Sequence, residues 1–188
     1  MINDLQTSAC KTYKYVDDTT ILHTGTDPRS DALQGAASEI AQWCQINDMK
    51  INTSKTKELL FSFSKQPSVA LPAVHLENQI IERTPSAKLL GIYITDDLKW
   101  NTHINHITKK ASQRLYMLST LKKAGVPQAD LLTIYTAKIR SVVEYGCECW
   151  HPGLTDYLNK QIEMIQKRAL KIIYGMQIHY TDALTINK

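Results

Sequence analysis

The chain has 188 residues, of which 43% are hydrophobic and 21% charged, a composition of folded domains that excludes a disordered protein. No apolar run is long enough to cross a membrane and the first residues lack a signal-peptide pattern, so we expect an intracellular protein, nuclear or cytoplasmic, with no membrane partner. Residues 1–100 hold 10 Lys and Arg against 12 Asp and Glu, and residues 101–188 hold 12 against 6, which gives net charges of −2 and +6. An acidic half and a basic half suit a nucleic-acid enzyme, although solvated surface charge gives the same totals.

The first predicted element is a β-hairpin over residues 12–22 with two adjacent carboxylates, Asp17 and Asp18, at its tip. The β-branched, aromatic and apolar residues on both sides of the pair favour paired strands. Adjacent carboxylates repel each other unless cations lie between them, and polymerases and nucleases transfer phosphoryl groups with paired divalent ions. The pair indicates a magnesium site; the alternative is a solvated turn, since Asp favours turns.

Next along the chain we expect an amphipathic helix of roughly 18 to 20 residues, with Asp27 as N-cap and an end at Asn47–Asp48. Residues 58–63 predict a buried strand, and a meander of short strands follows it. Within that meander residues 88–94 predict one continuous strand. Gly91 in its interior indicates close approach by another part of the backbone.

From residue 101 the hydrophobic period is helical, with breaks at 125–127 and 152–153 that separate three predicted helices. Each helix carries one apolar stripe. The stripes consist of Ile104, Ile107, Ala111, Leu115 and Leu118, then Leu131, Tyr135, Ile139 and Val142, and then Leu154, Leu158, Ile162, Ile165, Ala169 and Ile172.

Basic residues lie off these stripes and are the candidate nucleic-acid contacts. They are Lys109, Lys110 and Arg114 on the first helix and Lys160, Lys167 and Lys171 on the third. The three lysines of the third helix share its polar face, which could follow phosphates; a solvated helix face has the same pattern.

The four cysteines, Cys10, Cys44, Cys147 and Cys149, are too few and too unevenly placed for a disulfide scaffold, which indicates reduced thiols. Together with His151, the last two supply only three zinc ligands at an unusual spacing, so buried thiols near a helix end are the favoured interpretation. His103 and His106, at a helix start, are interpreted as surface or capping side chains.

Several separated segments together resemble the reverse transcriptases of non-LTR (LINE-type) retrotransposons. Residues 2–5 resemble the end of the helix before the catalytic hairpin, 14–22 that hairpin, 43–56 the next motif, 88–104 the primer-grip strand and its exit, and 143–154 and 165–170 the helical thumb and connecting region. The resemblance implies an α+β fold. Residues 1–100 would form a partial polymerase palm, and residues 101–188 an all-α thumb-like bundle.

The resemblance also implies roles for individual residues. Asp17 and Asp18 would be catalytic metal ligands for two Mg²⁺ ions in the complete enzyme, which would act on an RNA template, a DNA primer and dNTPs. Lys55 matches a lysine proposed to protonate or neutralise the departing pyrophosphate, and it could equally be a turn cation. Leu90 and Gly91 would lie where the primer end is held, with strand packing as the competing account.

Three parts of a full palm have no counterpart in these residues: an earlier strand with a third carboxylate, a glutamine-glycine segment and the fingers. Asp4 precedes the hairpin closely and matches a helix end, so we do not assign it as the third ligand. We therefore expect a fragment of a retrotransposon RNA-directed DNA polymerase that binds metal weakly or not at all and is inactive alone. The alternatives are a non-catalytic nucleic-acid-binding remnant that uses the basic helical half, and an inert transposon relic.

Overall fold

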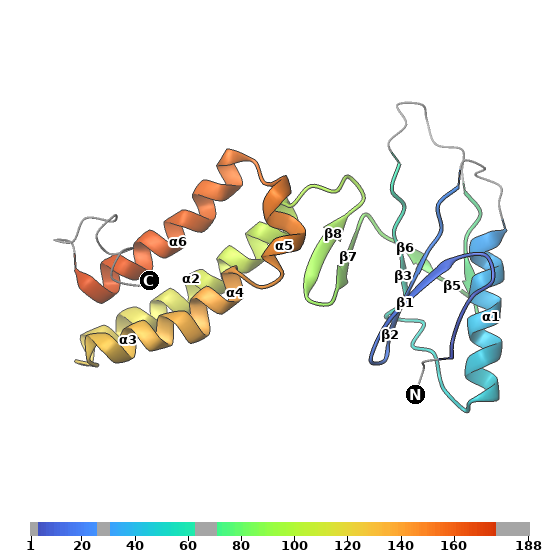
Figure 1. Ribbon diagram of the computed structural model, residues 1–188, viewed down its shortest axis with the longest axis horizontal. Helices are drawn as coiled ribbons and strands as arrows, with labels where there is room; N and C mark the ends of the chain where they lie inside the picture. The colour runs from blue at the N-terminus through green and yellow to red at the C-terminus, as the bar shows by residue number, and fades with distance from the viewer. Residues whose placement is uncertain (1–3, 26–30, 63–70, 176–188) are drawn as a thin grey trace. The chain divides into compact units, whose positions relative to one another are not determined.

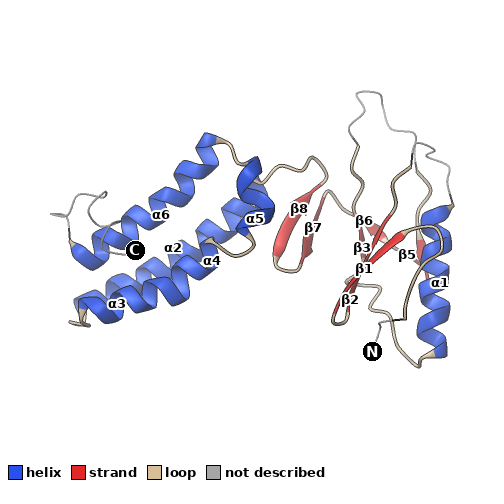
Figure 2. Ribbon diagram, in the orientation of Figure 1, coloured by secondary structure: helices blue, strands red, loops and turns tan. Residues whose placement is uncertain are grey.

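The computed structural model describes residues 4–25, 31–62 and 71–175, and the chain divides into two compact units, Met1–Ala87 and Lys88–Lys188 (Figure 1). In the described residues the first unit contains short strands and a helix, whereas the second contains most of a strand hairpin and several helices (Figure 2). This mixture confirms the predicted α+β class. Residues 2–3 of the segment that resembles a helix end lie outside the described residues, as do Asp27 and Pro28.

The first unit begins with the predicted hairpin. Strands β1 (Lys11–Tyr15) and β2 (Asp18–Leu22) pair antiparallel over five residue pairs, with Tyr15 opposite Asp18 and the turn at residues 16–17. Contacts to the preceding residues support β1: Lys14 Nζ donates a hydrogen bond to the Leu5 carbonyl oxygen over 2.8 Å, and the Thr7 and Thr12 hydroxyls lie 2.8 Å apart.

Helix α1 (Ala32–Ile46) has 15 residues, fewer than the roughly 18 to 20 that its period predicted. Its N-cap residue is Asp31, and Asn47 follows its last turn, as expected. One face packs against β4, and Ala37 joins Leu76 and Ile81 in the small core of this unit.

Four two-residue strands complete the first unit. The strands β4 (His75–Leu76) and β5 (Gln79–Ile80) form an antiparallel hairpin, and β3 (Lys57–Glu58) pairs in parallel with β6 (Glu82–Arg83). Opposite charges face each other across the parallel pair, since Arg83 Nε lies 2.9 Å from a Glu58 carboxylate oxygen. The buried strand predicted at 58–63 is wrong: only Glu58 is in a strand, because residues 59–62 have no partner strand among the described residues, and Phe63 lies outside them.

Another hairpin begins at the boundary between the units, with Ser86 and Ala87 in the first unit and its remaining residues in the second. Strands β7 (Ser86–Leu89) and β8 (Ile92–Thr95) form a two-stranded sheet with Leu90 and Gly91 as the connection between them. The continuous strand predicted at 88–94 is therefore wrong. Leu90 and Gly91 both have positive φ, 47° and 89°, which turns the chain instead of extending it, and so Gly91 lies at a hairpin tip.

Helices of three to 23 residues follow, with interruptions near the two predicted positions and a further one at residues 144–146 that divides the second predicted helix. They are α2 (Asn101–Lys123), α3 (Gln128–Ile134), the π-helix η1 (Tyr135–Arg140), α4 (Ser141–Val143), α5 (Cys147–Trp150), the 3₁₀-helix η2 (His151–Gly153) and α6 (Asp156–Tyr174). In the described residues no helix is both long and apolar enough to span a membrane.

The predicted apolar stripes form the main core of this unit, with shifts at two places. Val143 is buried where Val142 was predicted, because the wide turn of η1 advances the inward face by one residue. On α6 the last buried residue is Ile173, and the predicted Ile172 is half-buried. The buried residues of this core are Ala111, Leu115, Leu118, Leu131, Tyr135, Ile139, Val143, Ile165, Ala169 and Ile173.

A second core joins the β7–β8 hairpin to the helices. Trp150 and Leu158 pack with Ile104 and Ile107 of α2, and Ile92 of β8 lies against them. This packing ties β8 to α2, so β8 belongs to the same compact unit as the helices.

Candidate functional site

The tip of the first hairpin presents both aspartates to solvent. Asp17 lies in the turn and Asp18 begins β2, and both side chains are exposed. The preceding Val16 is 79% exposed and has φ of 56°, a strained conformation for a β-branched residue. The structure therefore confirms the predicted presentation of the carboxylates at a hairpin tip.

Among the described residues, Asp17 and Asp18 have no third carboxylate beside them at this tip. The Asp4 carboxylate accepts a hydrogen bond of 3.3 Å from the Trp43 indole Nε1, which gives it a partner of its own. Among the described residues no group of three His, Cys, Asp or Glu side chains could hold a metal ion. The donor chemistry suits Mg²⁺, which prefers carboxylate oxygens, but the number of ligands does not complete a site.

Lys55 lies in a turn of the same unit. The Asn52 side-chain oxygen Oδ1 accepts hydrogen bonds from the Lys55 backbone N–H over 3.2 Å and from the Ser54 hydroxyl over 2.7 Å. These contacts fix the turn and leave the lysine side chain exposed. No hydrogen bond or ion pair joins Lys55 to Asp17 or Asp18 within the part of the chain that the structure describes, so both interpretations of this residue stay open.

The tip of the second hairpin is held by Tyr145, which lies between α4 and α5. The Tyr145 hydroxyl donates a 3.0 Å hydrogen bond to the Leu90 carbonyl oxygen. A Cβ atom added to Gly91 would lie 3.1 Å from Tyr145 Cε1, so the ring fits against the bare backbone of the glycine. The sequence predicted close approach by backbone at Gly91, and the group that lies there is instead the side chain of Tyr145, which was not predicted. The signal in the sequence is the adjacent Gly146, the N-cap residue of α5.

His103 is buried, contrary to its interpretation as a surface side chain. It is 1% exposed, and its ring lies between Trp100 and Trp150 with centroid separations of 6.3 and 5.6 Å. Nδ1 accepts a 3.4 Å hydrogen bond from the Tyr93 backbone N–H, and Nε2 has no partner among the described residues. Burial, with a smaller effect of the nearby His106, lowers the pKa of His103, which favours the neutral ring.

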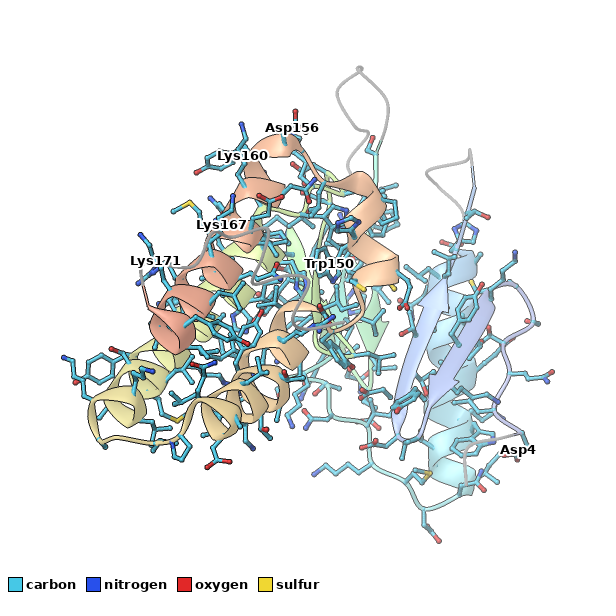
Figure 3. The ribbon with its side chains drawn as sticks, turned by 60° about the vertical axis from the view of Figure 1, so that its left-hand side comes forward. Asp4, Trp150, Asp156, Lys160, Lys167 and Lys171 are labelled. Carbon is cyan, nitrogen blue, oxygen red and sulfur yellow. The ribbon has the colours of Figure 1, made fainter. Side chains whose placement is uncertain are left out.

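The basic residues predicted to contact nucleic acid differ in exposure and in their interactions with other protein groups. Lys109 and Lys110 are exposed on α2, but the Arg114 guanidinium donates a hydrogen bond to the Lys138 carbonyl oxygen in η1. On α6 the exposed Lys160, Lys167 and Lys171 project from one side of the helix (Figure 3). Lys167 Nζ lies 3.3 Å from a carboxylate oxygen of Glu163, which neutralises part of the stripe.

All four cysteines are free thiols, as predicted. Cys147 is half-buried and Cys149 is exposed, so the prediction of two buried thiols near a helix end is wrong. The reason is that α5 has a single turn, which buries Trp150 fully, packs Cys147 half-buried against the same core and leaves Cys149 exposed.

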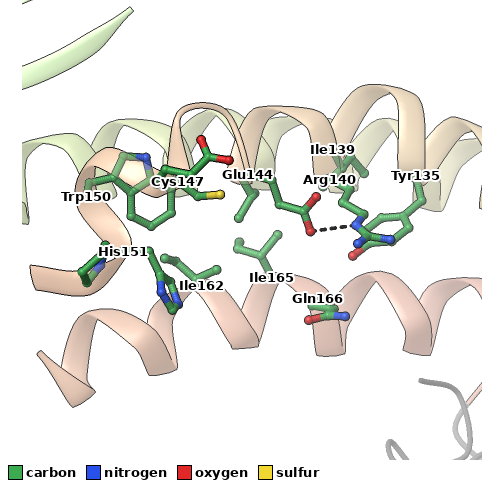
Figure 4. Close-up of a pocket in the computed structure, with 13 residues that line it drawn as sticks. Tyr135, Ile139, Arg140, Glu144, Cys147, Trp150, His151, Ile162, Ile165 and Gln166 are labelled. Atoms are coloured by element: carbon green, nitrogen blue, oxygen red, sulfur yellow. Dashed lines mark hydrogen bonds and ion pairs between the residues drawn. The ribbon is translucent and has the colours of Figure 1, made fainter. Parts of the chain in front are cut away.

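A cavity of about 460 Å³ lies in the helical unit, and Cys147 and Trp150 are among the residues that line it. Ile139, Ile162 and Ile165 contribute to its apolar walls, and an Arg140–Glu144 ion pair of 2.7 Å lies among the residues that line it (Figure 4). None of the residues predicted to act in catalysis or in nucleic-acid binding lines this cavity.

Two curated proteins of Drosophila melanogaster match most of the chain. It is 26% identical over 178 residues to "Probable RNA-directed DNA polymerase from transposon BS", which covers 93% of this chain and 19% of that protein. It is 24% identical over 152 residues to "Probable RNA-directed DNA polymerase from transposon X-element", with 79% of this chain and 16% of that protein covered. The chain is thus similar to transposon polymerases over most of its length and spans less than a fifth of theirs.

A family model described as the N-terminal region of "Alkylated DNA repair protein alkB homolog 8" matches residues 100–141. This segment runs from the start of α2 to the start of α4 and covers less than a quarter of the chain. No solved structure matches the chain.

Proposed function

We propose that this chain is part of a retrotransposon reverse transcriptase, with residues 1–100 as the trailing part of the palm and residues 101–188 as the thumb and connecting region. The observation that carries the proposal is the similarity to two transposon RNA-directed DNA polymerases over 93% and 79% of the chain. The hairpin supports it, because an antiparallel pair with Asp17 and Asp18 at the tip presents carboxylates where phosphoryl transfer needs metal ligands.

Asp17 and Asp18 would each contribute carboxylate oxygens to Mg²⁺ in the complete enzyme. Bound Mg²⁺ there would neutralise charge on the triphosphate of the incoming nucleotide. The hairpin itself orients the two side chains, since Tyr15 pairs with Asp18 and five ladder pairs fix the strands behind the turn. The remaining ligands would come from outside the described residues, which contain no cluster of three ligating side chains.

It follows that these 188 residues alone should be inactive as a polymerase. A metal held by two exposed carboxylates is bound weakly and in loose geometry, and loss of preorganised charge stabilisation commonly lowers rates by orders of magnitude.

Metal-ligand roles can be tested without activity. Mn²⁺ replaces Mg²⁺ at carboxylate sites and broadens the NMR signals of nearby amides, so titration should broaden the amide signals at residues 16–18 first. The change Asp17→Asn should remove this selective broadening, and Asp130→Asn, at an exposed position in the first turn of α3, should not. Equal broadening in wild type and Asp17→Asn would remove Asp17 from the metal site.

Primer extension supplies the second test. Wild type and Asp17→Ala should both show no Mg²⁺-dependent incorporation above background. Incorporation by wild type that disappears in Asp17→Ala would contradict the proposed inactivity and retain the ligand role of Asp17.

A second candidate function is non-catalytic nucleic-acid binding by the helical unit. The exposed Lys160 and Lys171 favour it, because neither has an ion-pair partner in the part of the chain that the structure describes. Binding of a DNA–RNA duplex should weaken steeply with salt, and each lost phosphate contact should lower the slope of log K against log salt by about 0.9. The double change Lys160→Ala and Lys171→Ala should show this, and Lys99→Ala, at a lysine paired with Asp97, serves as control; an unchanged slope would rule out the α6 stripe.

A further inference from the structure

Tyr145 contacts the second hairpin through an exposed side chain. The side chain is 56% exposed, so burial of its ring explains little of its placement. Its hydroxyl is nevertheless bonded to the Leu90 carbonyl oxygen over 3.0 Å, and its ring lies against Gly91. The contact is directed at the two residues of the turn and not at the strands behind them.

Residues of the helical unit hold the backbone of Tyr145 in place. The Trp150 indole Nε1 donates a 3.0 Å hydrogen bond to the Tyr145 carbonyl oxygen, and Trp150 itself is only 2% exposed. Gly146 has φ of 62°, and a Cβ atom there would lie 2.7 Å from Ile92 Cδ1, so this backbone packs closely on β8. A buried residue thus anchors the tyrosine backbone, and the tyrosine hydroxyl anchors the hairpin tip.

The surface formed at this tip has the chemistry of a nucleic-acid contact. Leu90 is 41% exposed beside the exposed Tyr145 ring, and Lys88 is exposed on β7. Apolar and aromatic surface suits the faces of sugars and bases, and a nearby cation suits phosphate.

We propose that Tyr145 is a positioning residue that holds the Leu90–Gly91 tip for contact with the 3′ end of a nucleic-acid primer. We call the contacts of Tyr145 with Leu90 and Gly91 the clamp, and these contacts are observed. The identity of the ligand, a primer, rests on the proposed function. Tyr145 acts through the hairpin tip, because its hydroxyl is already bonded to the Leu90 carbonyl.

Hydrogen exchange tests the clamp without any ligand. Tyr145→Phe keeps the ring and removes only the hydroxyl, so amide exchange at residues 90–92 should accelerate by about two- to tenfold, the effect of one lost hydrogen bond. Tyr116→Phe is the matched control, since Tyr116 is 78% exposed on α2. Unchanged exchange at the tip in Tyr145→Phe would overturn the proposal.

Binding to two duplexes tests the ligand. The wild-type chain should prefer a DNA–RNA duplex with a recessed DNA 3′ end to a blunt duplex of the same length. Tyr145→Phe should lose about two- to tenfold of this preference and keep its affinity for the blunt duplex. An additional variant, Gly91→Ala, places a Cβ atom 3.1 Å from the ring at a residue with φ of 89° and should reduce the preference at least as much.

The two measurements separate the two claims. If exchange accelerates in Tyr145→Phe but the wild-type chain does not distinguish the duplexes, the clamp stands and the proposed primer contact is wrong. If the wild-type chain prefers the recessed end and Tyr145→Phe keeps that preference in full, the positioning role of Tyr145 is wrong and the proposed function survives.

Discussion

The two hairpins β1–β2 and β7–β8 have similar tips that are supported in different ways. Each tip contains a non-glycine residue with positive φ, Val16 at 56° and Leu90 at 47°. The first hairpin rests on a ladder of five residue pairs, and no described residue from another element is hydrogen-bonded to its turn. The second is bound at its tip by Tyr145 and packed at β8 on Trp150 and its neighbours. Its position should therefore depend on distant residues, and that of β1–β2 on its own strands.

Trp150→Ala should produce the largest difference between the two hairpins in protection from hydrogen exchange. Trp150 is 2% exposed and lies at the centre of the second core, and removing a buried aromatic side chain costs about 3–5 kcal/mol. Hydrogen exchange should show loss of protection in β7–β8 and in the helices, with β1–β2 unchanged. Tyr157→Ala, at a position 67% exposed, is the control for tolerance of a lost aromatic ring. Equal loss of protection in both hairpins would contradict their independence.

Substitution of two glycines, one in each unit, should give the next largest effect, on the free energy of unfolding. Gly146→Ala adds a Cβ atom 2.7 Å from Ile92 Cδ1 at a residue with φ of 62°, so the free energy of unfolding should fall by about 1–3 kcal/mol. Gly35→Ala is the matched control, because Gly35 lies inside α1 with no other atom within 4 Å of the added Cβ. That change should stabilise the first unit by about 0.5–1 kcal/mol, as alanine does within a helix. Urea denaturation of both variants measures the contrast.

Acid should weaken the second hairpin before the first. The pKa of His103 is lowered by burial in the folded state, so the unfolded chain binds more protons than the folded chain between the two pKa values. Stability from the neutral ring is complete above the unfolded pKa of about 6.5 and falls as pH drops below it. Protonation also removes the Nδ1 lone pair that accepts the Tyr93 N–H. Protection factors at residues 92–95, which correct for the intrinsic slowing of amide exchange in acid, should fall from pH 7 to pH 5.

His103→Gln tests this assignment, because glutamine does not titrate. The variant should have lower stability at pH 7 and a flatter pH dependence of exchange at β8. His106, which packs on the Tyr93 ring at 4.8 Å between centroids, is the other imidazole beside β8 and supplies the control variant His106→Gln. A flat profile in His106→Gln together with an unchanged profile in His103→Gln would transfer the effect to His106.

The features predicted correctly from the sequence are those that local hydrophobic periodicity determines. The β1–β2 hairpin and the buried residues of α2 follow from alternating and helical spacing, and both are confirmed. The burial of His103 could not be predicted, because it depends on Trp150, which is distant in sequence. Val143 is buried in place of Val142 because η1 is a π-helix, and no residue type within η1 predicts a π-helix. The turn at Leu90 was missed since leucine rarely adopts positive φ.

The smallest effects come from the tips themselves. Positive φ at Val16 but not at Asp17 is the pattern of a type II′ turn, which favours glycine first, whereas positive φ at both Leu90 and Gly91 is the pattern of type I′, which favours Asn-Gly.

Val16→Gly and Leu90→Asn should therefore each stabilise their hairpin, by about 0.5–1 kcal/mol. Exchange rates at β1–β2 should fall in Val16→Gly. In Leu90→Asn they should fall less at β7–β8, because the bond from Tyr145 to the residue 90 carbonyl already holds that turn. Combining Leu90→Asn with Tyr145→Phe removes this support and should restore the full benefit of asparagine. If Leu90→Asn is equally stabilising with and without the Tyr145 hydroxyl, the second tip is as independent of distant residues as the first.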